Sequence, residues 1–148
     1  MVIETLKLLF NRDLLRLKTE INSYKDESKI WIVEKSIANS AGNLCLHLIG
    51  NLNTYIGAEF GKTNYIRNRE LEFSLKNISK NQLIEQIENT ILVVEMSLNN
   101  ITEDELKNEH PVLVFDKTTT IEYLLIHLTT HLTYHLGQIN YHRRLLDN

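Results

Sequence analysis

The chain has 148 residues, 43% of them hydrophobic and 24% charged, and a formal net charge of −3, which fits one soluble domain over residues 1–148. The negative charge argues against nucleic acid as a partner, because nucleic-acid-binding proteins usually carry a clear positive excess. No apolar run approaches the roughly 18 residues that cross a bilayer, and a lone cysteine suits a reducing compartment, so we expect a cytoplasmic protein without membrane contact.

An amphipathic helix is predicted at the N-terminus, over residues 2–24, because apolar residues recur there at steps of three and four. Charged residues interrupt this segment, so it lacks the continuous apolar core of a signal peptide. Leu8, Leu9 and Leu15 widen the apolar stripe beyond one face, and we expect this surplus to be buried in a homodimer. The stripe itself consists of Leu6, Phe10, Leu14, Leu17 and Ile21.

The second predicted helix, over residues 37–60, carries a polar stripe through an apolar stretch. Asn43 and Asn51 lie four residues before and after His47, and positions four apart differ by only about 40° around a helix. Cys45 lies about 200° from His47 on the same helix, so we assign it to core packing.

Residues 61–75 are polar, contain no strong helix pattern and are predicted to form a loop. A loop of this length in a compact bundle is more often functional than accidental. Arg67 and Arg69 could bind an anionic group, such as a carboxylate of a thiol cofactor, by bidentate pairing. The alternative is that they are solvated or structural loop charges.

The third predicted helix, over residues 81–99, begins at a capping box formed by Ser79 and Gln82. The fourth begins at a second box of this kind, formed by Thr119 and Glu122, and continues almost to the C-terminus.

A short extra helix is predicted to open at Thr102–Glu105. With five glycines and one proline in the chain, few positions break regular structure. The predicted fold class is therefore all-α: an antiparallel four-helix bundle with short extra helices in its connections, one of which can be a crossover.

Histidines recur along the fourth helix at His127, His131 and His135, each four residues from the next, so they form one stripe. A lone histidine is usually a surface residue or a hydrogen-bonded core residue, and we interpret His110 and His142 in this way. A pair at this spacing is different, because two rings can converge on one cation at about 2.0 to 2.1 Å for zinc. A third ligand must then come from another segment.

His47 can complete a three-histidine site if the second and fourth helices face each other. The Glu-x-x-His pairs of di-iron bundles and the His-Glu-x-x-His motif of zinc proteases are absent from the sequence. The pattern therefore favours a mononuclear site of neutral imidazoles. Gln138, Asn43 and Asn51 could hydrogen-bond to its rings and orient them, or they could be ordinary polar helix positions.

Two segments resemble a known family. The stretch HLTTHLTYHLGQI is similar to the C-terminal helix signature of the DinB-like superfamily, in which a His-x-x-x-His pair is followed closely by Gly-Gln. The stretches GNLCLHLIGNLNTYIG and NYIRNRELEFS resemble a bacterial branch of that superfamily whose members largely lack an assigned function.

The resemblance covers nearly the whole chain and implies a four-helix bundle, commonly a homodimer, with a divalent metal at its centre. It places the ligands at His47, His131 and His135. His127 has a counterpart in the family as well, and we expect it to lie beside the ligands and not to be one of them. Relatives include bacillithiol S-transferases and the mycothiol-dependent maleylpyruvate isomerase, in which the metal is thought to bind a low-molecular-weight thiol.

Three neutral histidines leave a coordination position open, as in catalytic sites. The activated species would be a metal-bound water or a thiolate. Imidazole ligands suit several metals, and we expect zinc or nickel. The main hypothesis is a metal-dependent enzyme that acts on a small molecule, with thiol transfer ahead of hydrolysis. The rival hypothesis is a non-enzymatic dimeric helical module in which the metal is structural or absent.

The hypothesis makes a geometric prediction. Nitrogens of His47, His131 and His135 should converge on a point about 2.0 to 2.2 Å from each, with no fourth protein ligand. His127 should lie on the same face one turn away, because eight residues of helix rise by about 12 Å.

Overall fold

The computed structural model describes residues 1–110 and 117–148, and within these ranges the chain is all-helical and contains no strand. An isolated antiparallel bridge joins Glu109 to Thr120. No helix in the described ranges combines the length and the apolar character that a membrane crossing requires. The α-helices are α1 (Val2–Asn22), α2 (Ala41–Leu52), α3 (Arg69–Ser74), α4 (Lys80–Leu98) and α5 (Ile121–Leu146). The remaining helical segments are η1 (Glu27–Trp31), η2 (Asn53–Ala58) and η3 (Glu105–Lys107).

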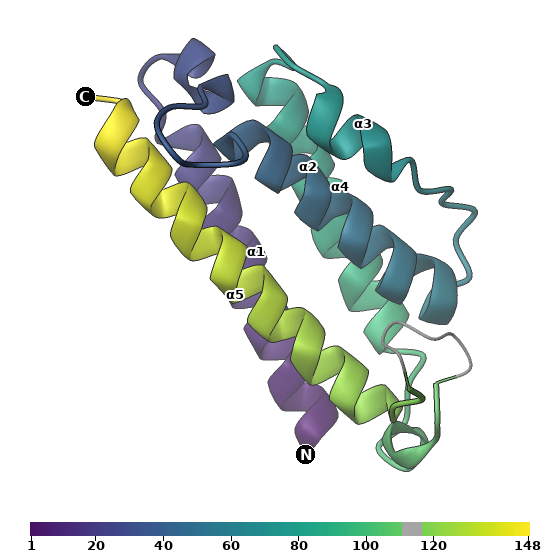
Figure 1. The fold of residues 1–148 in the computed structure, drawn as a ribbon. Helices are drawn as coiled ribbons and strands as arrows, with labels where there is room; N and C mark the ends of the chain where they lie inside the picture. Colours follow the sequence, from purple (N-terminus) through teal and green to yellow (C-terminus); the bar gives the residue numbers. More distant parts are fainter. Residues whose placement is uncertain (111–116) are drawn as a thin grey trace.

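The four long helices, α1, α2, α4 and α5, lie side by side (Figure 1). Helices α1 and α5 run away from the end of the molecule that holds the N-terminus, and α2 and α4 run towards it. Helix α1 packs on α4 and α5, and α2 packs on α3, α4 and α5. Because α2 and α4 run in the same direction, the connection between them, residues 59–79, returns along α2 and carries α3 with it (Figure 1).

The core forms where the predicted apolar stripes meet. All five stripe residues of α1 are buried, and so are four leucines that recur every four residues along α5. Helix α2 is buried along its whole length, because α3, α4 and α5 surround it. Because every residue of α2 is buried, its polar residues, such as His47, are interior groups. These four leucines of α5 are Leu124, Leu128, Leu132 and Leu136.

The predicted N-terminal cap is confirmed for α4 and is wrong for α5. Ser79 and Gln82 form the predicted capping box at the start of α4. At α5 the cap is Thr120, whose side chain accepts from the backbone N–H of Tyr123. Thr119 instead accepts from the N–H of His110 through its backbone carbonyl, so the predicted start at Thr119 was wrong by one residue.

The second helix is shorter than predicted and changes its winding. It begins at Ala41, where Ser40 caps it, and from Asn53 to Ala58 it continues as the π-helix η2. Asn53 and Thr54 donate side-chain hydrogen bonds to the carbonyls four residues earlier, contacts that bend helices and compete with their backbone bonds. Wide turns of this kind are often found at functional sites.

The predicted loop over residues 61–75 contains a helix, so that prediction was wrong for α3. Asn68 caps this helix by accepting from the N–H of Leu71. A helix of six residues spans less than two turns and shows little apolar periodicity, and its stability comes from packing instead of propensity.

Candidate metal centre

Three histidines from two helices meet at the contact between α2 and α5. The ring of His47 lies 5.0 Å from that of His131 and 5.3 Å from that of His135, between ring centroids, and the last two rings lie 4.6 Å apart. Each residue offers one nitrogen, and the three nitrogens lie within 4.8 Å of one another. These residues therefore lie close enough to bind one metal ion.

The separation between His47 and His131 fits a pair of metal ligands. Their Nε2 atoms are 3.2 Å apart. Two nitrogens at about 2.0 to 2.1 Å from a tetrahedral ion would be about 3.3 to 3.4 Å apart. The donor set, three uncharged imidazoles from rigid helices, suits a divalent transition metal.

Outer hydrogen bonds set the tautomers of two of these rings. Nδ1 of His47 lies 3.1 Å from Oε1 of Glu72, and Nδ1 of His135 lies 2.7 Å from Oε1 of Gln138. A carboxylate or amide oxygen only accepts, so each Nδ1 carries the proton and each Nε2 keeps its lone pair for a metal. Nδ1 of His131 is buried, and none of the described residues hydrogen-bonds to it.

The surroundings of His47 and His131 also keep these two rings uncharged. Burial, with His135 and His47 nearby, lowers the pKa of His131 to about 4. Burial lowers the pKa of His47 as well, although its hydrogen bond to Glu72 opposes the shift. Metal ligation requires neutral imidazole, and both groups are neutral at neutral pH.

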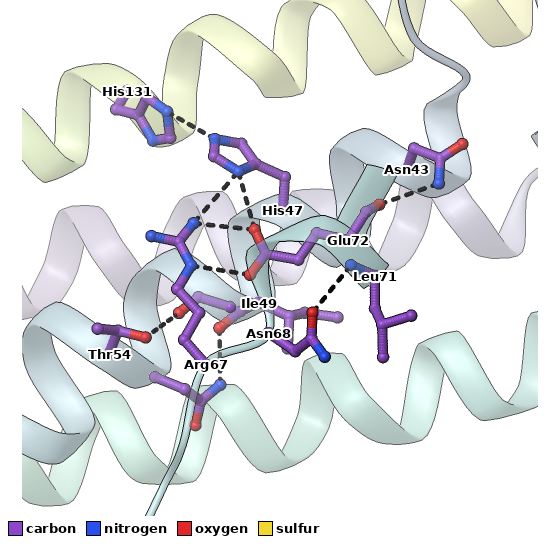
Figure 2. Close-up of polar contacts among 11 residues, drawn as sticks. Asn43, His47, Ile49, Thr54, Arg67, Asn68, Leu71, Glu72 and His131 are labelled. Atoms are coloured by element: carbon purple, nitrogen blue, oxygen red, sulfur yellow. Dashed lines mark hydrogen bonds and ion pairs between the residues drawn. The ribbon is translucent and has the colours of Figure 1, made fainter. Parts of the chain in front are cut away.

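Glu72 is the residue of the site that the sequence did not reveal. Its carboxylate is buried on α3 and is held by Arg67, whose Nε and Nη2 donate to its two oxygens at 2.8 and 2.9 Å (Figure 2). A Cβ at Gly50 would collide with this carboxylate, so the glycine makes room for it. Glu72 lies within the charged run RNRELE, which is typical of a solvated segment.

The two arginines proposed for anion binding, Arg67 and Arg69, have different contacts. Arg67 is paired with Glu72 and lies over the ring of Tyr55, with 5.9 Å between its Cζ and the ring centroid. Arg69 lies over Phe73 at 5.2 Å. The fork of Arg67 therefore already binds a carboxylate of the chain itself.

The polar residues that were predicted to orient the rings differ in their contacts. Asn43 touches no histidine in the described hydrogen bonds; its Nδ2 donates to the carbonyls of Glu72 and Leu75 and fixes α3 on α2 (Figure 2). Asn51 is buried, and its Oδ1 has no hydrogen-bond partner among the residues that the structure describes. The ring of His127 stacks at 6.3 Å on that of His131, one turn away as expected.

The remaining histidines have structural surroundings, as the sequence predicted for them. Nδ1 of His142 accepts from the hydroxyl of Tyr24 at 2.6 Å, and Nε2 donates to the carbonyl of Ile32 at 2.8 Å. His110 is buried beside Phe60, with 5.6 Å between the ring centroids. Cys45 is buried in the core, also as predicted.

Comparison with known proteins gives one family. The sequence pattern of the family described as "Protein of unknown function (DUF1572)" matches residues 5–148. No curated protein matches the chain.

Proposed function

The chain belongs to the DUF1572 family, and we propose that it is a metal-dependent enzyme whose divalent ion, zinc or nickel, is held by His47, His131 and His135. The observation that carries this proposal is the meeting of three imidazole nitrogens from α2 and α5. Two of these rings also direct their Nδ1 protons outward, to Glu72 and Gln138.

The fold that we propose for this family member is a single DinB-like four-helix bundle domain over residues 1–148. The support is the packing of four long helices in two opposite directions and the position of the histidine pair on α5. Gly137 and Gln138 follow that pair directly, as in the signature of the DinB-like superfamily.

The chain's contribution to the chemistry is a neutral, partly enclosed set of ligands. Three imidazoles add no negative charge and leave a coordination position open, which distinguishes catalytic from structural sites. A divalent ion held in this way would acidify a coordinated water or hold a thiol as thiolate. Aromatic rings of Phe73 and Tyr134 lie at 5.0 and 5.3 Å from His47 and His135, between ring centroids.

We propose thiol transfer with a low-molecular-weight thiol as the first reaction to test, and hydrolysis as the second. The test begins with protein purified without a histidine tag. Elemental analysis should find a divalent metal bound in a one-to-one ratio, and the metal-loaded protein should transfer a thiol to an electrophile or hydrolyse an ester or amide. A loaded protein without either activity would favour the rival hypothesis, in which the metal only joins α2 to α5.

A further inference from the structure

We propose that Glu72 is a positioning residue of the metal site, through which metal binding at α2 and α5 is coupled to the docking of α3. This inference rests on the proposed metal binding. It concerns the pairs Arg67–Glu72 and Glu72–His47, which connect the segment between α2 and α4 to one ligand ring (Figure 2).

The first step is that the Glu72 carboxylate is costly to bury and that both of its oxygens accept hydrogen bonds. Glu72 is only 5% exposed, and a buried charge must be paired and hydrogen-bonded to be tolerated. Arg67 forms the ion pair by donating to both oxygens of the Glu72 carboxylate, and Oε1 also accepts from His47. Glu72 reaches His47 at Nδ1, whereas Nε2 of His47 faces Nε2 of His131 and would face the metal, so Glu72 would act on the ligand and not on the ion.

The second step is that separate features of the chain place this carboxylate. Asn43 holds the backbone carbonyl of Glu72 at 2.9 Å. Gly50, one turn after His47 on the buried helix, leaves the space that a side chain would fill. Tyr55 lies beneath the guanidinium of Arg67, on the π-helical turn η2.

The third step is the consequence for the ligand. An anionic acceptor at Nδ1 fixes the tautomer and orientation of the imidazole and makes its other nitrogen a better donor to a metal. The reciprocal effect follows from thermodynamic linkage: an ion that binds His47 in this orientation must favour the state in which Glu72, and with it α3, is docked.

The test compares zinc affinity, measured by chelator competition, among tag-free variants. We expect Glu72→Ala to weaken zinc binding about 10- to 100-fold. Glu72→Gln, which keeps an accepting oxygen but loses the charge, should recover part of this loss. The matched control is Glu20→Gln, which removes an Arg–Glu pair of the same length, Arg143 to Glu20 at 2.8 Å, between α1 and α5; its zinc affinity should equal that of the wild type.

The absorption spectrum of the cobalt-substituted protein provides a second readout. It should change in Glu72→Gln and remain unchanged in Glu20→Gln, because only the first substitution alters a ligand ring. Zinc affinities of both Glu72 variants equal to the wild-type value would overturn the inference and leave the proposed metal site intact. A wild-type protein that binds no zinc would instead refute the proposed function.

The wild-type protein supplies a measurement that does not depend on any variant folding. Adding zinc should slow amide hydrogen exchange in residues 67–76 as well as around the three histidines. Unchanged exchange in residues 67–76, with slowed exchange in α2 and α5, would show that α3 is not coupled to the ion.

Discussion

His131 and His142 lie on the same helix, yet their rings have different surroundings. His131 faces two other histidines, whereas His142 bridges Tyr24 and the carbonyl of Ile32. We expect His131→Ala to lose most of the bound metal and remain folded. His142→Ala should keep the metal but lose stability, by about 1 to 3 kcal/mol, because it leaves a buried hydroxyl and a carbonyl without a partner.

Elemental analysis and urea unfolding of both variants test this pair of outcomes. Similar metal loss in the two variants would mean that the ligands lie elsewhere along the histidine stripe.

Acid should destabilise the metal-free protein through His131. Its pKa is lowered from 6.5 to about 4, first by burial and then by His135 and His47. Between these pKa values the unfolded chain binds a proton that the folded protein does not bind, so the stability present at neutral pH falls as pH drops from 6.5 towards 4. Urea unfolding at several pH values should show a smaller fall for His131→Asn than for the wild type. An equal loss of stability in the two proteins would mean that another group causes the acid destabilisation.

At this scale the sequence predicted the three histidines that meet and the contact of Gln138 with His135, but not Glu72. The i, i+4 spacing of His131 and His135 is a local property of one helix, so the pair could be found without a fold. Glu72 contacts His47 from 25 residues away, and this contact depends on the path of the connection between α2 and α4. Three charged residues lie within the five positions before it, Arg67, Arg69 and Glu70, so nothing local distinguished it from a solvated residue.

At the scale of the elements, two helical glycines should respond in opposite directions to the same substitution. Alanine normally stabilises a helix relative to glycine by about 1 kcal/mol. A methyl group added at Gly137, in α5, would meet nothing within 4 Å, so Gly137→Ala should stabilise the protein. A methyl group at Gly50 would collide with Glu72, whose carboxylate cannot move without leaving Arg67 and His47, so Gly50→Ala should destabilise it.

Thermal unfolding of the two variants beside the wild type provides the measurement. If Gly50→Ala proved as stable as Gly137→Ala, the carboxylate of Glu72 would have to lie elsewhere.

The long elements could be predicted because their apolar residues repeat over many turns, as in α1 and α5. Shorter elements could not. Helix α3 has six residues, and its cap at Asn68 is one polar residue among several. The predicted start of α5 was displaced by one residue because three threonines, at positions 118 to 120, precede the helix. The structure shows that the side chain of Thr120 caps the helix, while the carbonyl of Thr119 accepts from the N–H of His110.

At the scale of the whole molecule, the sequence favoured an antiparallel bundle and left open whether one of its connections is a crossover. The direction of each helix depends on the length of the connection before it. The segment of residues 59–79 is long enough to let α4 run either opposite to α2 or in the same direction. In the structure this segment runs back along α2, so α2 and α4 run in the same direction (Figure 1). This path brings α3 beside α2 and thereby Glu72 beside His47.

The surplus leucines of α1 lead to a prediction about assembly. Leu8 and Leu15 are 72% and 45% exposed, and we propose that a homodimer buries them. Sedimentation at micromolar concentration should give a dimer for the wild type and a monomer for the double variant Leu8→Glu, Leu15→Glu. A wild-type monomer at that concentration would contradict the proposal.

The most direct test of the metal site is a crystal structure of the tag-free protein with equimolar zinc, with anomalous scattering recorded at the zinc edge. We predict one anomalous peak between α2 and α5, about 2.0 to 2.2 Å from a nitrogen of each of His47, His131 and His135, with no fourth protein ligand. A peak bound elsewhere, or a crystal without zinc at these three histidines, would contradict the account.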